Sequence, residues 1–367
     1  MPAAPIEAQL EGIERGGGEG EVQLGRGATL HVSSLGKVYF PDVGVTKGAL
    51  MRYYARIAPV LLPHLEGRPL VLKRYPEGVG GQMFFQQDAG AHVPDVVSVQ
   101  ALQTEEKGKR MRIIGGDLAT LLYTVQLGAI EVHPWLSRVD EIESPDRCLI
   151  DLDPGDDVEF TSVVALAREV VRVVEECGLT AAVKTSGSTG IHIVIPLPAH
   201  TTYAASVLLA TRIAELTAML RPERATVARS IRDRPAGTIY VDALQNARGK
   251  SAASAYSVRA RSGAPVSAPL RPAELTGRLR MSAFTTRTMP ARIEQMGDIW
   301  RSALRARPTA RALERAMRML DEALERPPTM KRGTAKRGTA KRGSAGGRNA
   351  GSGVARRRAG RASDADK

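Results

Sequence analysis

Cysteine, aromatic residues and long apolar runs are all scarce in this chain of 367 residues. It has 2 cysteines, and 4% of its residues are aromatic. Two cysteines cannot form a disulfide framework, and no Cys/His group has the spacing of a zinc site. The longest apolar stretch, around residues 163–174, is interrupted by Arg168 and Glu169, and the N-terminus has no secretory signal pattern. We therefore expect a soluble, cytoplasmic protein with no membrane contact.

Acidic residues are scarce in one part of the chain. The net charge is +13, but from residue 331 onward there are 12 basic and 2 acidic residues, against 40 and 37 in residues 1–330. The end of the chain repeats Lys-Arg-Gly-Thr-Ala and has no apolar face, so we predict a basic disordered tail over residues 327–367. Such an arm binds phosphate backbones without reading sequence. A solubilising extension is the simpler interpretation.

The rest of the chain is predicted to be a short leader followed by one α/β domain. Residues 1–20 are Gly-rich with little periodicity, which predicts a disordered leader. Residues 21–326 contain apolar runs of strand length, and residues 160–177 and 203–220 carry apolar side chains at helical spacing. The domain is therefore predicted to mix strands and helices over residues 21–326.

Local signals place three further elements in this domain. Residues 21–24 and 29–32 flank Gly25-Arg26-Gly27 and predict a hairpin. Thr46 is a good N-cap for the helix that follows it. Residues 254–261 are predicted to be a strand on which Arg259 and Arg261 share a face, because alternate residues of a strand point the same way.

Two aspartates one residue apart end an apolar run. Asp151 and Asp153 stand either side of Leu152, and Pro154-Gly155 then stops the strand. Alternate side chains on a strand share a face at roughly 6–7 Å, so the two carboxylates project together while Leu152 points into the core. Two such carboxylates repel each other unless a cation such as Mg²⁺ or Mn²⁺ lies between them. An isolated Asp-x-Asp is also common as a solvated strand end.

A loop rich in small residues follows about thirty residues later. Ser186 and Gly187 begin it, Gly190 ends it, and His192 lies on the apolar strand that continues. Gly and Ser allow backbone N–H groups to approach an anion closely, although such a loop is often only a turn. Another apolar strand then delivers Asp242 at or near its end. Aspartates and an anion-binding loop together indicate nucleotide chemistry.

Several other residues are candidates for the same site, each with a simpler alternative. Lys37 and Lys47 flank the turn before the Thr46 helix, where two solvated lysines are equally expected. Lys73 ends a strand with a cation. Of the adjacent Phe84 and Phe85, one is expected in the core and the other is free to stack on a base, unless both are buried. His133 lies on an apolar strand, where it is most simply a core histidine.

The constellation of aspartates, anion loop and cations is the set that two-metal phosphoryl transfer requires. In this order it resembles the polymerase domain of bacterial DNA ligase D, a branch of the archaeo-eukaryotic primase superfamily, over about residues 29–300. The matching motifs are Leu152-Asp153-Pro154-Gly155 after Asp151, Thr185-Ser186-Gly187 with Gly190-Ile191-His192, and Tyr240-Val241-Asp242 with Gln245-Asn246. The resemblance implies a primase-polymerase fold, with central mixed or antiparallel sheets flanked by helices.

The resemblance also implies roles for individual residues. Asp151, Asp153 and Asp242 would be the catalytic ligands of two Mn²⁺ or Mg²⁺ ions. Lys37 and Lys47 would bind the 5′-phosphate on the far side of a DNA gap. Phe84 or Phe85 would stack near the template. The residues implied to hold the incoming nucleotide are Lys73, His133, Ser186, His192, Arg232, Gln245 and Arg259.

The implied function is a template-directed nucleotidyltransferase that fills gaps or extends ends in non-homologous end joining. It would use NTPs or dNTPs, with a preference for ribonucleotides, and work with Ku and a DNA ligase near the bacterial nucleoid. The chain has no Lys-x-Asp-Gly ligase motif, which predicts a stand-alone polymerase module. Thr189 stands in the anion loop where family members often carry a basic residue.

Three alternatives remain at this level. The enzyme could synthesise primers de novo. The chain could instead be a catalytically silent module that binds DNA ends or Ku. Thr189 and the basic tail favour this alternative. A metal-dependent nuclease or a glycosyltransferase would use the Asp-x-Asp acids but would leave Lys37, Lys47 and the predicted Arg259/Arg261 pair without a role.

Overall fold

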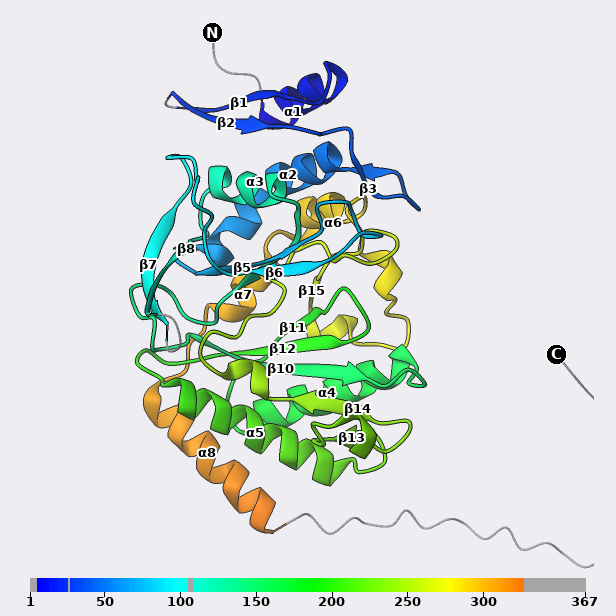
Figure 1. Cartoon of the computed structure of the whole chain (residues 1–367). Helices are drawn as coiled ribbons and strands as arrows, with labels where there is room; N and C mark the ends of the chain where they lie inside the picture. The colour runs from blue at the N-terminus through cyan, green and yellow to red at the C-terminus, as the bar shows by residue number, and fades with distance from the viewer. Residues whose placement is uncertain (1–4, 26, 105–107, 327–367) are drawn as a thin grey trace, which may run out of the picture. The chain divides into compact units, whose positions relative to one another are not determined.

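Six strands form the main sheet of this computed structural model, in the order β13-β14-β10-β12-β11-β15 (Figure 1). The structure describes residues 5–25, 27–104 and 108–326. Strands β13 and β14 run parallel, and the other neighbouring pairs run antiparallel. The predicted α/β class with mixed or antiparallel sheets is therefore confirmed. The strands are β10 (Arg147–Pro154), β11 (Ala182–Thr185), β12 (Ile191–Pro196), β13 (Ala225–Thr226), β14 (Ile239–Asp242) and β15 (Pro269–Leu270).

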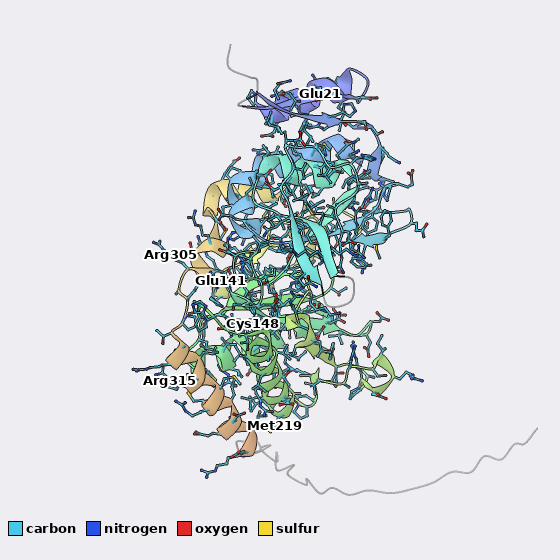
Figure 2. All side chains as sticks on the ribbon, turned by 60° about the vertical axis from the view of Figure 1, so that its left-hand side comes forward. Glu21, Glu141, Cys148, Met219, Arg305 and Arg315 are labelled. Carbon is cyan, nitrogen blue, oxygen red and sulfur yellow. The ribbon has the colours of Figure 1, made fainter. Side chains whose placement is uncertain are left out.

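Two long helices, α4 (Phe160–Glu176) and α5 (Tyr203–Leu220), pack against this sheet (Figure 1). The apolar stripe of α4 is buried, as its helical spacing predicts. On β10 the fully buried Ile150 and Leu152 alternate with Asp151 and Asp153. The strand therefore has a core face and an acidic face. Cys148 (Figure 2) and Cys177 are both buried and free.

Helix α5 is the described helix that is long and apolar enough to cross a membrane by length and composition. The sequence analysis had placed the most apolar stretch around residues 163–174 instead. Here α5 packs against α4, β10 and the C-terminal helix α8 (Ala310–Glu325), and its buried residues include Leu209 and Ile213. These contacts are those of a core helix in a globular domain.

A smaller sheet, in the order β6-β5-β9, lies above the main one in Figure 1 together with α2 and α3. The Tyr53 and Tyr54 hydroxyls of α2 donate to the backbone oxygens of Tyr256 and Ile130 at 2.9 and 2.7 Å. The elements of this part are α2 (Lys47–Leu65), α3 (Leu118–Gln126), β5 (Leu70–Arg74), β6 (Phe84–Gln86) and β9 (Ala129–Pro134).

The remaining elements are short strands and helices around these two sheets. The hairpin predicted from Gly25-Arg26-Gly27 is formed by β1 and β2, and the Thr46 side chain caps α2 by accepting from Ala49 N at 3.0 Å. Both predictions are confirmed. The bounds are β1 (Gly20–Gly25), β2 (Ala28–Val32), β3 (Val38–Phe40), β4 (Val45–Thr46), β7 (Val99–Thr104), β8 (Gly108–Ile113), α6 (Met289–Met296) and α7 (Ile299–Leu304), with 3-10 helices η1 (Ile231–Asp233), η2 (Leu244–Asn246), η3 (Pro272–Glu274) and η4 (Met281–Ala283).

Two predicted segments are different in the structure. The leader over residues 1–20 is not disordered throughout, because it contains α1 (Ile6–Arg15), whose Leu10 is fully buried and which contacts α2 and β1. Ile6, Leu10 and Ile13 recur at helical spacing. The helical pattern spans only these three residues, and the Gly-rich segment that follows it favoured the prediction of disorder. Residues 254–261 form no strand; they make isolated bridges and turns. The tail predicted at residues 327–367 lies outside the described residues.

Gly190, at the entry to β12, has no room for a side chain. A Cβ atom there would lie 2.1 Å from the carbonyl oxygen of Leu152 on the neighbouring strand β10. We therefore expect Gly190→Ala to lower the free energy of unfolding by about 3 kcal/mol, because a backbone atom cannot move aside without disturbing the sheet. Urea denaturation would measure it. Gly277→Ala is the matched control, since nothing lies within 4 Å of its Cβ position; equal stabilities of the two variants would contradict the expectation.

Candidate functional site

One row of polar side chains crosses four strands of the main sheet. Asp151 on β10 pairs directly with Asp242 on β14 and with His192 on β12. His192 in turn pairs with Lys184 on β11. Directly paired residues of neighbouring strands project from the same face of a sheet. The row therefore brings together residues that lie up to 91 positions apart in the sequence, from Asp151 to Asp242.

The acidic end of the row consists of the three predicted aspartates. The side chain of Asp153 is 55% exposed, and that of Asp151 is 27% exposed. Burial and the negative charges of Asp153 and Asp242 raise the pKa of Asp151 to about 7. These carboxylates repel each other, which is the electrostatic condition that a divalent cation relieves.

The Asp242 carboxylate is turned into its own loop. It accepts hydrogen bonds from Leu244 N at 2.8 Å and from Gln245 Nε2 at 3.2 Å, and the Tyr240 hydroxyl approaches at 3.3 Å. In this conformation no group of three acidic, His or Cys side chains among the described residues converges closely enough to hold a metal ion. The oxygen donors that Mg²⁺ and Mn²⁺ prefer are nevertheless all on one face.

The basic end of the row contains a lysine that the sequence analysis missed. Lys184 Nζ donates to His192 Nδ1 and to Ser267 Oγ, both at 2.7 Å. This leaves His192 Nε2 facing Asp151 Oδ1 at 3.4 Å. Burial lowers the pKa of both Lys184 and His192 well below their ordinary values. A lysine in the otherwise apolar strand Ala182–Thr185 was the available signal.

Glu131 is a second residue that the sequence analysis missed, and it organises the predicted cations. It lies on β9, is 1% exposed, and accepts hydrogen bonds from Lys73 Nζ at 3.2 Å and His133 Nε2 at 2.8 Å. Arg259 Nε donates at 2.8 Å and Ala260 N at 3.2 Å. Glu131 precedes His133 by two residues on an apolar strand, so the two share a face. A buried acid at that spacing was the signal.

The loop around Ser186 is closed by its own hydrogen bonds. Ser188 N and Gly190 N donate to Ser186 Oγ at 3.1 and 3.0 Å, and Ser186 N donates to Gly190 O at 2.9 Å. These three N–H groups are therefore paired within the loop in this conformation, and binding of an anion by this loop stays a prediction. Arg259 Nη1 also donates to the Ser186 carbonyl, so it joins this loop to Glu131.

Arg234, rather than the predicted Arg232, approaches the aspartates. Arg232 is exposed on η1. The Arg234 guanidinium lies 3.7 Å from Asp153 Oδ2 and stacks at 4.0 Å over the Tyr240 ring. Arg259 likewise lies in the site while Arg261 is exposed, because the predicted strand at 254–261 does not form.

Comparison with known proteins agrees with this geometry. Residues 46–300 match the family model described as LigD, primase-polymerase domain. The multifunctional non-homologous end joining protein LigD of Pseudomonas aeruginosa is 33% identical over 291 residues, which are 78% of this chain and 34% of that protein. The bifunctional protein LigD of Bacillus subtilis is 33% identical over 269 residues, 73% of this chain and 43% of that protein.

The structure agrees as well. The polymerase domain from Mycobacterium tuberculosis ligase D, solved in complex with DNA, superposes with a TM-score of 0.70 at 30% identity. The match covers 76% of this chain and 99% of that one. The chain belongs to the LigD primase-polymerase domain family. Its fold is thus the expected primase-polymerase fold, and its family is that of the nucleotidyltransferase domains of end-joining DNA repair. The chain spans about a third to two fifths of the length of these curated LigD relatives.

A second, basic cavity lies in the part of this LigD-family domain built from β3, α2 and β5. It measures about 240 Å³, and Lys37, Lys47 and Arg74 all line it. Lys47 Nζ donates to Ser33 O at 2.9 Å, and burial together with the charges of Lys37 and Arg74 lowers the pKa of Lys47 to about 8. Lys37 pairs with the exposed Glu77 at 2.6 Å. The structure thus brings the two predicted lysines together.

The two adjacent phenylalanines are both exposed. Phe84 is 41% and Phe85 is 59% exposed, so the expectation that at least one lies in the core is wrong. Strand β6 is an edge strand of its sheet, paired with β5 on one side. The Arg74 guanidinium lies 4.9 Å from the Phe84 ring centre. This contact places the aromatic pair next to the Lys37/Lys47 cavity.

We expect Glu131→Gln to lower the free energy of unfolding by roughly 3–5 kcal/mol at neutral pH, because removing one partner of a buried ion pair leaves Lys73 and Arg259 without a counter-charge. Although burial alone would raise it, the hydrogen bond from His133 and the charge of Arg259 hold the pKa of Glu131 well below its usual range. The stabilisation is thus present above the pKa of an unfolded glutamate, about 4.3, and is lost as pH falls through lower values.

Urea denaturation of both proteins from about pH 3 to pH 7 would check this, with the stability curves converging at the acidic end. Glu294→Gln removes an exposed ion pair with Arg56 and is the matched control, with an expected loss of about 1 kcal/mol or less. If Glu131→Gln behaves like this control, the organising role of Glu131 is wrong.

Proposed function

We propose that this chain is a template-directed nucleotidyltransferase that fills gaps or extends ends in non-homologous end joining. The observation that carries the proposal is the row Asp242–Asp151–His192–Lys184 with Asp153 beside it, in a chain of this family. NTPs or dNTPs are the proposed substrates, and DNA with a 5′-phosphate at the gap or end is the proposed template.

Asp151, Asp153 and Asp242 would hold two divalent cations, for which we propose Mn²⁺ or Mg²⁺. Bound there, the cations would lower the pKa of the attacking hydroxyl and stabilise charge on the triphosphate. His192 Nε2 faces Asp151 and orients its carboxylate, while Lys184 fixes the tautomer of His192. Gln245 holds Asp242 in the same way from its own loop.

The nucleotide would lie over the cations that Glu131 organises. Lys73 and Arg259 each give one hydrogen bond to Glu131, which uses only part of their donor capacity. Their remaining N–H groups would bind phosphate oxygens, whereas a neutral His133 gives its single N–H to Glu131 and would act by positioning that carboxylate. Ser186 would contribute its hydroxyl rather than an open loop of backbone N–H groups, and Arg232 and Arg234 extend the cationic rim.

The cavity of Lys37 and Lys47 would bind the 5′-phosphate across a gap, and Phe84 and Phe85 would stack against bases. The structural relative from M. tuberculosis was solved with DNA, which supports DNA as the ligand here. Ku and a DNA ligase are the proposed partners, and the proposed location is the cytoplasm at the nucleoid. The tail beyond residue 326 would add non-specific affinity for phosphate backbones.

A catalytically silent DNA-end binding module is the second candidate. The observation in its favour is that the Asp242 carboxylate is held by its own loop and that no three-ligand group converges in the described chain. Thr189 also favours this candidate, because it stands in the Ser186 loop where family members often carry a basic residue. DNA affinity without incorporation in either metal would select this candidate, and synthesis without a primer would select de novo priming.

We expect Asp153→Ala to abolish primer extension on gapped DNA, with a loss of at least ~10³-fold, since a ligand of the catalytic metals is removed. Extension of a labelled primer in Mn²⁺ and in Mg²⁺ measures this. Asp156→Ala is the matched control, as Asp156 is an exposed acid three residues further along. Activity in Asp153→Ala equal to that of the control would refute the metal assignment.

We expect Lys37→Ala to weaken binding of gapped DNA about tenfold when the gap carries a 5′-phosphate, and hardly at all when it does not, since one charge-assisted contact is lost. Fluorescence anisotropy with the two DNAs measures the difference. Arg278→Ala removes one exposed positive charge elsewhere and serves as control. The same loss with both DNAs would show that Lys37 does not read the phosphate.

A further inference from the structure

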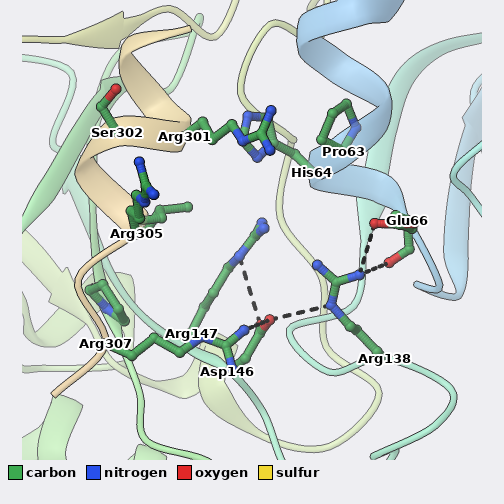
Figure 3. Close-up of a pocket in the computed structure, with 12 residues that line it drawn as sticks. Pro63, His64, Glu66, Arg138, Asp146, Arg147, Arg301, Ser302, Arg305 and Arg307 are labelled. Atoms are coloured by element: carbon green, nitrogen blue, oxygen red, sulfur yellow. Dashed lines mark hydrogen bonds and ion pairs between the residues drawn. The ribbon is translucent and has the colours of Figure 1, made fainter.

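Five arginines line a cavity at the other end of β10. It measures about 500 Å³, and Figure 3 shows its side chains converging on one open space. Strand spacing places Arg147 about 13 Å from Asp151 along the same face of β10. None of the three aspartates lines this cavity. Its arginines are Arg138, Arg147, Arg301, Arg305 and Arg307.

Positive charge exceeds negative charge in the wall of this cavity. Asp146 is the acid at its centre, and the fully buried Arg68 donates to its two oxygens at 2.7 and 2.5 Å. Arg307 donates to the same carboxylate at 3.1 Å, while Arg138 and Arg147 approach it to 3.6 and 3.7 Å. One carboxylate thus faces four guanidinium groups and cannot neutralise them.

The other charged groups around the cavity do not restore the balance. Glu66 is 72% exposed and lies 3.6 Å from Arg138, so solvent screens it. His64 faces the cavity but is paired with Asp298 at 2.9 Å on its far side. Arg301 and Arg305 make no side-chain ion pair or hydrogen bond within the described chain. The cavity therefore carries excess positive charge.

One largely buried guanidinium group lines the cavity without a close counter-charge. The Arg147 side chain is only 14% exposed, points into the cavity in Figure 3, and has a carboxylate no nearer than 3.7 Å. Burial and the charge of Arg68 lower the pKa of Arg147. A largely buried donor without a close partner is unfavourable, and an anion in the cavity would supply that partner.

We propose that this cavity is a binding site for a compact oligophosphate anion, separate from the polymerase site. Guanidinium groups bind phosphate oxygens in pairs of parallel hydrogen bonds, and several of them around one space suit a ligand with several negative charges in a small volume. The volume lies in the range of small-molecule sites. The shared chemistry is a di- or triphosphate group, either as inorganic polyphosphate or as the phosphates of a nucleotide.

The shape of the site favours a small anion over nucleic acid. Contacts to a DNA backbone follow the line of phosphates along the duplex, whereas these arginines converge on one compact cavity (Figure 3). The side chains that line it include no Phe, Tyr or Trp to stack on a base. The phosphates, rather than a base, are therefore the recognised group, and binding of a duplex end is an outcome that the experiment can detect.

The test is isothermal titration of the full chain with inorganic tripolyphosphate in EDTA, so that phosphate binding through catalytic metals does not contribute. We expect one site per chain. Arg305→Glu should weaken binding at least tenfold, because it reverses the charge of an exposed lining residue with no partner to lose. Arg318→Glu, an exposed arginine on α8, makes the same charge change and should alter binding less than twofold.

Two further measurements distinguish this site from the proposed polymerase site and identify which kind of phosphate compound binds. Asp151→Asn should keep full tripolyphosphate binding even though it would disable polymerisation, so failure of the proposed function leaves this result untouched. The tripolyphosphate titration is repeated with ATP already present. If ATP prevents tripolyphosphate binding, the site accepts nucleotide phosphates; if ATP has no effect, the site is assigned to inorganic polyphosphate. The proposal is overturned if Arg305→Glu binds like Arg318→Glu, or if only a 5′-phosphorylated duplex binds.

Discussion

The register of β10 against its two neighbours is the constraint on which the site depends. Asp151 lies opposite Asp242 on one side and opposite His192 on the other. A shift of either pair by one residue would turn its polar side chain to the core face and place an apolar one beside Asp151. The fully buried Ile150 and Leu152 oppose such a shift, since they would have to leave the core under α4 and α5. Packing of the apolar face of β10 thus fixes which polar side chains lie together on its other face. Gly190 lets β12 approach β10 closely enough for this pairing.

Glu131 has the corresponding role for the cations. Lys73, His133 and Arg259 come from β5, β9 and the segment after Tyr256, and the positive charges of Lys73 and Arg259 repel each other. A single buried carboxylate accepts hydrogen bonds from all three, and Arg259 also donates to the carbonyl of Ser186, in the loop after β11 of the main sheet. The smaller sheet is therefore joined to the main sheet by a charge network as well as by apolar contact. A neutral substitute of the same shape could not hold those cations together.

The sequence could predict elements whose signal is local. The Asp151/Asp153 pair, Asp242 at the end of its apolar strand, the long helices, the first hairpin and the Thr46 cap each depend on a few adjacent residues. It could not predict partners made by tertiary contact. Lys184 and Glu131 are ordinary strand residues until folding places His192 and Arg259 beside them. The predicted strand that would place Arg259 and Arg261 on one face fails for the same reason, because residues 254–261 make isolated bridges and turns instead. Phe84 and Phe85 are exposed because β6 is an edge strand, which no alternation pattern reveals.

Compensation of charge distinguishes the three charged clusters of this domain. At Glu131 the carboxylate and its cations are mutually hydrogen-bonded, so the cluster is stable by itself and its role is to hold position. At the C-terminal end of β10, Arg234 lies 3.7 Å from Asp153, and burial together with the charges of Asp153 and Asp242 raises the pKa of Asp151. At the N-terminal end, Asp146 faces four arginines, and the excess has the opposite sign. Excess charge in a partly buried site is costly unless a ligand neutralises it. One strand therefore carries excess negative charge at one end and excess positive charge at the other, and each excess is the kind that a ligand of opposite charge would relieve.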